Sequence, residues 1–193
     1  MEKLEEIIEE IHQVFDIRTK TRDQELKQAR LLTRYCANSI RATHRNDSKL
    51  AQEFLSKARE LVDTLLVDLS EYHDIYYAGY TQDALKEFAE ASITYALINN
   101  QGLPTPENLN IEHNTYLKGL AESVGELRRK CLDILRHGHS QEAEKVLNHM
   151  DEIYAVLVTI DYPDAITGGL RRLTDIVRGV TERTRGDLTL SLR

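Results

Sequence analysis

Residues 87–98 read EFAEASITYALI, and this segment sets the architecture expected of the chain. Apolar and small residues surround it on nearly every side, and a helix of that kind is normally buried among other helices. Its only charges are Glu87 and Glu90, whose spacing of three places them about 60° apart on one helical face. Buried glutamates are rare unless they are paired or bound to a cation. The segment therefore predicts a helical core that carries two carboxylates in need of a partner.

On both sides of this segment, apolar residues recur at helical spacing along almost the whole chain, which predicts an all-α fold. We expect one domain over residues 1–193, a bundle of about seven helices. These cover roughly residues 2–15, 19–45, 48–73, 81–99, 105–137, 141–160 and 161–185. Helix starts are indicated at Asn46-Asp47-Ser48, at Thr81, at Thr105-Pro106-Glu107 and at Ser140, where capping side chains precede apolar periodicity.

Composition narrows the class of protein. No apolar run approaches the ~18–20 residues needed to cross a bilayer, and the acidic N-terminus does not resemble a signal peptide. Cys36 and Cys131 lie in helical patterns without CxxC spacing, which is typical of reduced core residues in a cytoplasmic protein. The formal charge of −7 argues against broad DNA coating but leaves room for a local basic groove.

A second acidic pair lies in the helix expected after residue 105. Glu122 and Glu126 are four residues apart, on one face, among Gly, Ala, Leu and Val. Gly119 and Gly125 each cost about 1 kcal/mol of helix stability relative to alanine. Another helix that approaches closely at these glycines would explain that cost. The two acidic pairs would then face each other as a cluster of four carboxylates.

Such a cluster would repel itself, and a hard divalent cation would relieve the repulsion. Carboxylate oxygens are the ligands that Mg²⁺ and Mn²⁺ prefer, and the ion can activate water beside a phosphodiester. Acidic pairs on helices are also common on solvated faces. Two pairs on consecutive, poorly charged helices favour the metal site, and neither pair belongs to the Glu-x-x-His motif of di-iron bundles.

A basic stripe accompanies the acids. It falls within an arc of roughly 60° on the expected second helix and comprises Lys27, Arg30, Arg34, Arg41 and Arg45. One interpretation is contact with the phosphates of a nucleic acid. The other is a solvated face whose cations pair with acids on a neighbouring helix.

Three segments resemble the translin/TRAX family. Leu85–Ala91, LKEFAEA, resembles the EYVEA-type motif of TRAX, the catalytic subunit of the translin–TRAX complex. Tyr116–Leu127, YLKGLAESVGEL, resembles that family's YLLGVADLTGEL stretch, and the likeness extends to RDQELKQARLLTRYCANSIRATHR at residues 22–45. The order and lengths of the helices agree as well, so the resemblance spans most of the chain.

The resemblance implies a TRAX-like, Mg²⁺-dependent endoribonuclease that binds single-stranded RNA, with single-stranded DNA as an alternative ligand. Its catalytic and metal-binding residues would be Glu87, Glu90, Glu122 and Glu126, although TRAX carries aspartate where this chain has Glu122. It also implies a closed homo-oligomer, an octamer or hexamer, with sites facing inward. Two alternatives remain at this point: a non-catalytic, translin-like scaffold that binds RNA or DNA, and an all-α, MazG-like nucleotide pyrophosphohydrolase.

Overall fold

The computed structural model describes residues 1–192 as helices joined by short turns, without a strand among them. The helices are α1 (Glu2–His44), α2 (Ser48–Asp68), α3 (His73–Tyr76), α4 (Gly79–Ile98), α5 (Pro106–Leu109), α6 (His113–Leu135), α7 (Gln141–Leu157), α8 (Asp164–Thr167) and α9 (Leu170–Ser191). Six are long and three are single turns, so the expected all-α bundle is confirmed. No helix in this part of the chain combines the length and apolar character that a bilayer crossing requires.

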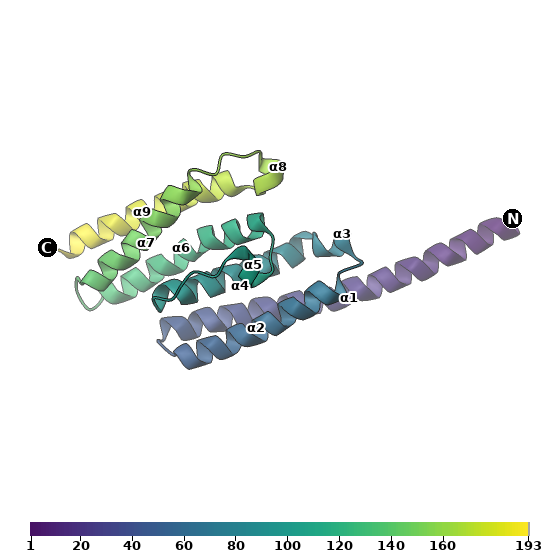
Figure 1. The fold of residues 1–193 in the computed structure, drawn as a ribbon, viewed down its shortest axis with the longest axis horizontal. Helices are drawn as coiled ribbons and strands as arrows, with labels where there is room; N and C mark the ends of the chain where they lie inside the picture. Colours follow the sequence, from purple (N-terminus) through teal and green to yellow (C-terminus); the bar gives the residue numbers. More distant parts are fainter. Residues whose placement is uncertain (193) are drawn as a thin grey trace.

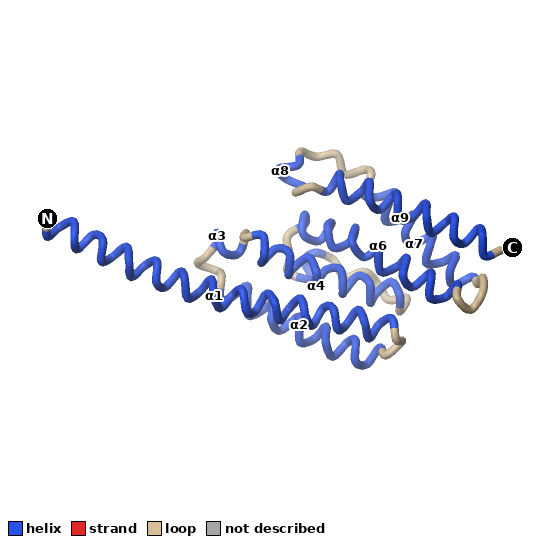
Figure 2. Tube along the Cα trace, turned by 180° about the vertical axis from the view of Figure 1, so that it is seen from behind, coloured by secondary structure: helices blue, strands red, loops and turns tan. Residues whose placement is uncertain are grey.

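The long helices form three layers of two. α4 and α6 make the middle layer, α1 and α2 pack on the α4 side, and α7 and α9 pack on the α6 side (Figures 1 and 2). One continuous apolar core runs through all three layers. The middle position of α4 follows from its sequence, because a helix that is apolar nearly all round must be covered on several faces.

Capping signals located several boundaries correctly. The Asp47 side chain accepts a hydrogen bond from the Leu50 amide and starts α2, and Ser140 accepts one from Ala143 to start α7. Thr105 forms a capping box at the start of α5. Thr81 does not cap α4, because that helix already begins at Gly79, and the Thr81 hydroxyl donates to the Ile75 carbonyl instead.

Other expected boundaries were wrong. The break near residues 16–18 is absent, and α1 is one helix of 43 residues, because no glycine or proline interrupts it. The third expected helix ends at Asp68, and residues 73–76 form the separate turn α3. The fifth is divided into α5 and α6, and the last into α8 and a longer α9. At these two divisions the chain takes left-handed φ at Asn110 and at Gly168 and Gly169, which no continuous helix accommodates.

The first part of α1 stands apart from the bundle. Residues 1–17 are all exposed, and they project beyond the end of the three layers (Figure 1). We call these residues the arm. Only from residue 18 onward does α1 join the bundle, where it packs against α2 and α4.

Candidate metal centre

The two acidic pairs face each other because α4 and α6 touch at Gly119. A Cβ atom placed on Gly119 would lie 2.6 Å from the Ala89 Cβ, and 2.9 Å from both the Glu90 nitrogen and the Lys86 carbonyl oxygen. Only glycine fits there, as the sequence predicted. The same expectation was wrong for Gly125, which is exposed and has nothing within 4 Å of its Cβ position.

Three of the four predicted carboxylates form one cluster. Glu87 and Glu90 from α4 and Glu122 from α6 each offer an oxygen, and these oxygens all lie within 4.8 Å of one another. All three side chains are partly buried. They meet across the close contact between the helices, so the spacing of three on α4 and the glycine on α6 together build the cluster.

Burial and mutual repulsion disfavour the ionised forms in this cluster. Burial, and then the charges of Glu87, Glu122 and Glu126, raise the pKa of Glu90 to about 8. Burial is also the main reason that the pKa of Glu87 lies above its ordinary value, with the Glu122 and Asp83 charges adding to it. A cation that enters would favour the ionised forms and bring these pKa values down.

Lys86 is the cation already beside the cluster. Its Nζ lies 2.7 Å from the Glu122 Oε2 and 3.8 Å from the Glu87 Oε1. Burial alone would lower the pKa of Lys86, but the hydrogen bond to Glu122 and the nearby negative charges outweigh it and leave that pKa raised. Sequence reasoning had not included Lys86 in the site, because its partner Glu122 lies on a different helix.

Glu126 lies outside the group of three and has a separate partner. Its Oε2 is 2.5 Å from the His44 Nε2 and 3.7 Å from the Arg129 Nη1. The hydrogen bond from His44 holds the pKa of Glu126 below its ordinary range, the opposite direction to the shift of Glu90. The four predicted acids are therefore arranged as three plus one, and the charge of Glu126 still acts on Glu90.

His44 is a second residue that sequence reasoning missed. It is the last residue of α1, its side chain is only 3% exposed, and its Nδ1 has no partner among the described residues. It meets Glu126 across 82 residues of sequence, so no local pattern links the two. In the fold, His44 fixes the orientation of Glu126.

The donor set fits a divalent cation of the Mg²⁺ class. Three converging carboxylate oxygens are hard ligands, and their common negative charge is only partly balanced by Lys86. No thiol or imidazole belongs to the group of three, which disfavours a zinc site. Glu87, Glu90 and Glu122 are thus the residues that would hold the ion, with Glu126 beside them.

The basic stripe lies along the face of α1 that points away from the bundle. Its members are all exposed, namely Lys27, Arg30, Arg34, Arg41 and Arg45. Within residues 1–192 none of them forms an ion pair with an acid, so the expected alternative of pairing with a neighbouring helix is not found. Arg41 and Arg45 flank His44 in the sequence at the end of α1, and both are exposed.

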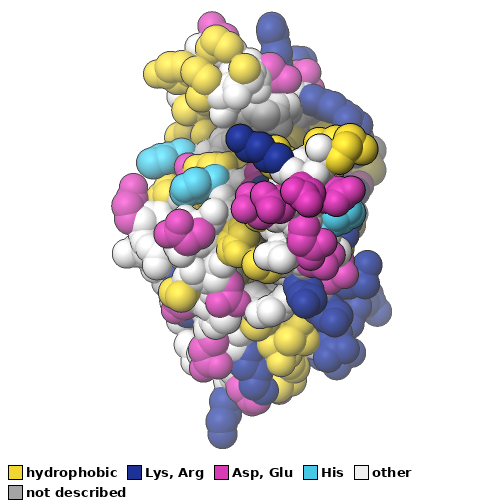
Figure 3. Space-filling view, turned by 90° about the vertical axis from the view of Figure 1, so that its right-hand side faces the viewer, with side chains coloured by type: hydrophobic (Ala, Val, Ile, Leu, Met, Phe, Trp, Pro, Cys, Tyr) yellow, Lys and Arg dark blue, Asp and Glu magenta, His cyan; other side chains and the backbone are white. Residues whose placement is uncertain are grey.

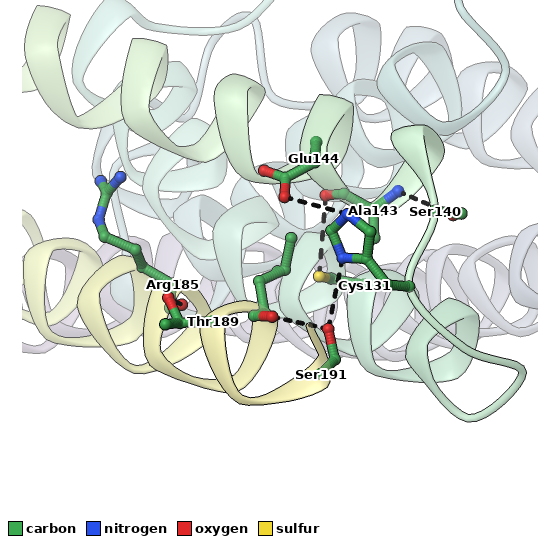
Figure 4. A network of polar contacts seen from close by, with 9 residues as sticks. Cys131, Ser140, Ala143, Glu144, Arg185, Thr189 and Ser191 are labelled. Carbon is green, nitrogen blue, oxygen red and sulfur yellow. Dashed lines mark hydrogen bonds and ion pairs between the residues drawn. The ribbon is translucent and has the colours of Figure 1, made fainter. Parts of the chain in front are cut away.

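The other histidine and cysteine candidates are structural. Ser140 caps α7 through the Ala143 amide, and the Cys131 thiol lies against the Ala143 carbonyl at 3.9 Å (Figure 4). His139 lies between Glu144, 3.5 Å away, and the Ser191 hydroxyl, 3.4 Å away. These contacts join the ends of α6, α7 and α9, and both cysteines are free and buried, as the sequence indicated.

Comparisons with known proteins give a consistent result, although no protein-family model matches the chain. The crystal structure of AfC3PO in complex with duplex RNA is 32% identical, covers 95% of each chain and has a TM-score of 0.87. The structure of AfC3PO alone gives the same identity and TM-score, over 95% of this chain and 96% of the other. Apo-NeC3PO, at 21% identity, has a TM-score of 0.87 over 95% and 96% of the two chains and shows the same fold. The uncharacterized protein MJ0175 of Methanocaldococcus jannaschii is 34% identical over 170 residues, 86% of this chain and 74% of that protein.

Proposed function

The chain belongs to the translin/TRAX family, and from this premise we propose that it is a metal-dependent endoribonuclease acting on single-stranded RNA. The observation that carries the proposal is the cluster of Glu87, Glu90 and Glu122, whose oxygens lie within 4.8 Å of one another. Glu87 and Glu90 lie in the segment that resembles the TRAX motif, and Glu122 stands where TRAX carries aspartate. A non-catalytic member of the family would have no need of three partly buried, mutually repelling carboxylates.

Each acidic residue has a distinct role in this proposal. Glu87, Glu90 and Glu122 bind Mg²⁺, or Mn²⁺, which when bound supplies positive charge to the phosphodiester and lowers the pKa of bound water. Glu126 is held ionised by His44 and accepts a hydrogen bond from the attacking water. The water oxygen attacks phosphorus and Glu126 receives one proton of that water. The bond from phosphorus to one ribose oxygen breaks, and that oxygen leaves as a hydroxyl with a proton from solvent water.

Substrate binding is assigned to the basic stripe. Its exposed cations run along α1, the helix whose last residue, His44, contacts Glu126, and we assign the phosphate chain to this face. A structure of AfC3PO, at 32% identity, in complex with duplex RNA supports RNA as the ligand class and makes duplex RNA the natural comparison substrate. Single-stranded DNA is the third ligand to compare.

The resemblance also leads us to propose a closed homo-oligomer, a hexamer or octamer, with its sites facing inward. Enclosure would limit cleavage to strands able to enter. It would also exclude bulk water from the acidic cluster and strengthen the electrostatic interactions within it. The oligomer number is a matter for measurement by light scattering.

Cleavage of labelled RNA tests the proposal directly. Purified protein is incubated with single-stranded and duplex RNA, in Mg²⁺, in Mn²⁺ or in EDTA, beside the Glu87→Gln/Glu90→Gln variant. The matched control is Glu60→Gln/Asp63→Asn, which has the same spacing but lies on the exposed face of α2. We expect metal-dependent cleavage that falls by about 100-fold or more in the first variant and is unchanged in the control.

Three other outcomes would contradict it. RNA binding without cleavage in either metal, by intact wild-type oligomer, would leave a translin-like scaffold. Release of pyrophosphate from nucleoside triphosphates, without RNA cleavage, would indicate a nucleotide hydrolase. Cleavage that survives both glutamine substitutions would place the reaction at another site. Light scattering of each variant separates loss of catalysis from loss of assembly.

A further inference from the structure

The arm carries an apolar face that nothing in the chain covers. Its large apolar side chains are between 41% and 62% exposed, and they are Leu4, Ile7, Ile8, Ile11, Val14, Phe15 and Ile17. An isolated helix of this length is marginal in water, and a contiguous apolar face of this size marks an interaction surface. Figure 3, which faces the end of the molecule from which the arm projects, shows acidic side chains gathered among hydrophobic ones.

The spacing of these residues is that of a coiled coil. Leu4 and Ile11 are seven apart, as are Ile7 and Val14, which gives an alternation of three and four residues along one stripe. Ile8 and Phe15 widen the stripe on one side. A stripe of this kind is completed by a second helix that carries the same pattern.

The distribution of charge along the arm indicates the identity and the orientation of the partner helix. Residues 1–10 contain five glutamates and a single lysine, Lys3, whereas residues 18–22 contain three basic residues and no acid. Two arms side by side in parallel would place the acidic ends together. Two arms in antiparallel orientation place the acidic end of each beside the basic segment of the other, which is the favourable arrangement.

The base of the arm supplies a second, independent observation. A groove of about 300 Å³ lies there, lined by residues that include Thr21, Gln24, Glu25 and Asp68. Glu25 is only 2% exposed, and neither of its carboxylate oxygens has a hydrogen-bond partner among residues 1–192. Buried carboxylates are normally paired. Lys20 also lines the groove, but among residues 1–192 it forms no hydrogen bond with Glu25, so this carboxylate is left without a partner.

We propose that the arm pairs in antiparallel orientation with the arm of a second copy of this chain, so that Lys3 of each copy enters the Glu25 groove of the other. Matching the layers of the two stripes places Ile11 opposite Val14, and Leu4 opposite Thr21. In the same register Lys3 is level with Arg22 and lies within one helical turn of Gln24, at the edge of the groove. The pairing gives the self-assembly proposed above a defined surface, and it requires neither RNA nor catalysis.

Sedimentation and light scattering without RNA test the pairing. Ile7→Glu/Ile11→Glu, the stripe variant, introduces charge into the stripe, whereas the matched control His12→Glu/Gln13→Glu adds it to the opposite face of the same helix. We expect the concentration at half-association to rise by about 100-fold or more in the stripe variant and to stay unchanged in the control. Thermal unfolding of the bundle should persist in both, which confirms that the body is folded. An unchanged molar mass in the stripe variant would overturn the proposal.

Orientation is tested by oxidative cross-linking, because Cys36 and Cys131 are buried and leave engineered thiols as the reactive ones. Leu4→Cys/Thr21→Cys should form a covalent dimer, whereas Leu4→Cys alone and Thr21→Cys alone should not. A dimer formed by Leu4→Cys alone would establish parallel arms and refute the antiparallel pairing. Absence of a dimer in the double variant, while the protein still associates, would show that the arm contacts some other surface.

Discussion

Replacing Gly119 by alanine should loosen the contact on which the acidic cluster depends. The new methyl group would lie 2.6 Å from the Ala89 Cβ and 2.9 Å from two backbone atoms of α4, none of which can rotate away. Overpacking of this kind costs about 3 kcal/mol, and the better helix propensity of alanine returns about 1 kcal/mol. We therefore expect Gly119→Ala to lower the free energy of unfolding by about 2 kcal/mol, which corresponds to about 4–8 °C in Tm.

Gly125→Ala is the matched control, six residues along the same helix. Nothing lies within 4 Å of its added Cβ, so the substitution changes only the helix propensity, which is higher for alanine than for glycine. The free energy of unfolding should therefore rise by up to about 1 kcal/mol. Urea unfolding at one protein concentration measures both variants. The two backbone atoms displaced in Gly119→Ala belong to Lys86 and Glu90, so RNA cleavage should fall further than the folded fraction does. Equal stabilisation by both substitutions would refute the close contact as the reason for Gly119.

Three further predictions concern buried groups. Burial raises the pKa of Glu25 to about 7 from an ordinary 4.5, so ionisation of this carboxyl opposes folding increasingly between pH 4.5 and 7. In the stripe variant, where the arm is unpaired, Glu25→Gln should leave the free energy of unfolding unchanged at pH 4.5 and raise it by up to about 3 kcal/mol at pH 8. A difference in the free energy of unfolding that is independent of pH would contradict this. Lys86→Met removes the cation beside the carboxylates, so without metal the variant should unfold at a lower temperature than wild type. Mg²⁺ should then raise the Tm of the variant more than it raises the Tm of wild type. Calorimetry with and without Mg²⁺ measures both effects. Burial raises the pKa of both cysteine thiols, that of Cys131 to about 11, so neither Cys36 nor Cys131 should react with a disulfide reagent at pH 8 until guanidinium is added, and rapid reaction of the native protein would argue against their burial.

Local signals predicted the parts of the fold that local physics determines. The cap at Asp47, the capping box at Thr105 and the cap at Ser140 each depend on side chains that satisfy amides two or three residues away, so the sequence shows them directly. The burial of α4 likewise follows from its own composition. The false break near residue 16 arose because the apolar pattern changes where the arm meets the bundle, while the backbone hydrogen bonds continue unchanged.

The site was predictable to the extent that its residues share a helix. Glu87 and Glu90, or Glu122 and Glu126, are visible as pairs, and the family resemblance joined the two pairs. Which residue partners which depends on helix packing. His44 reaches Glu126 from 82 residues away, and this contact, rather than anything in the ExxxE spacing, separates Glu126 from the other three acids. Gly119 and Gly125 look alike in sequence, and only the position of α4 distinguishes them.

Because α1 is continuous, it fixes the direction in which the arm's apolar stripe points relative to the bundle. One helix of 43 residues carries the arm at its beginning and His44 at its end, about 65 Å apart along the axis. Each residue inserted between them would turn the arm by about 100° relative to the bundle. Insertions are tolerated in the turns between helices, but within residues 18–44 a change of about seven or eleven residues, close to two or three full turns, is needed to bring the arm's apolar stripe back to about its original direction. The length of this segment can therefore change only by certain numbers of residues, even at positions where the identity of the side chain is free to vary.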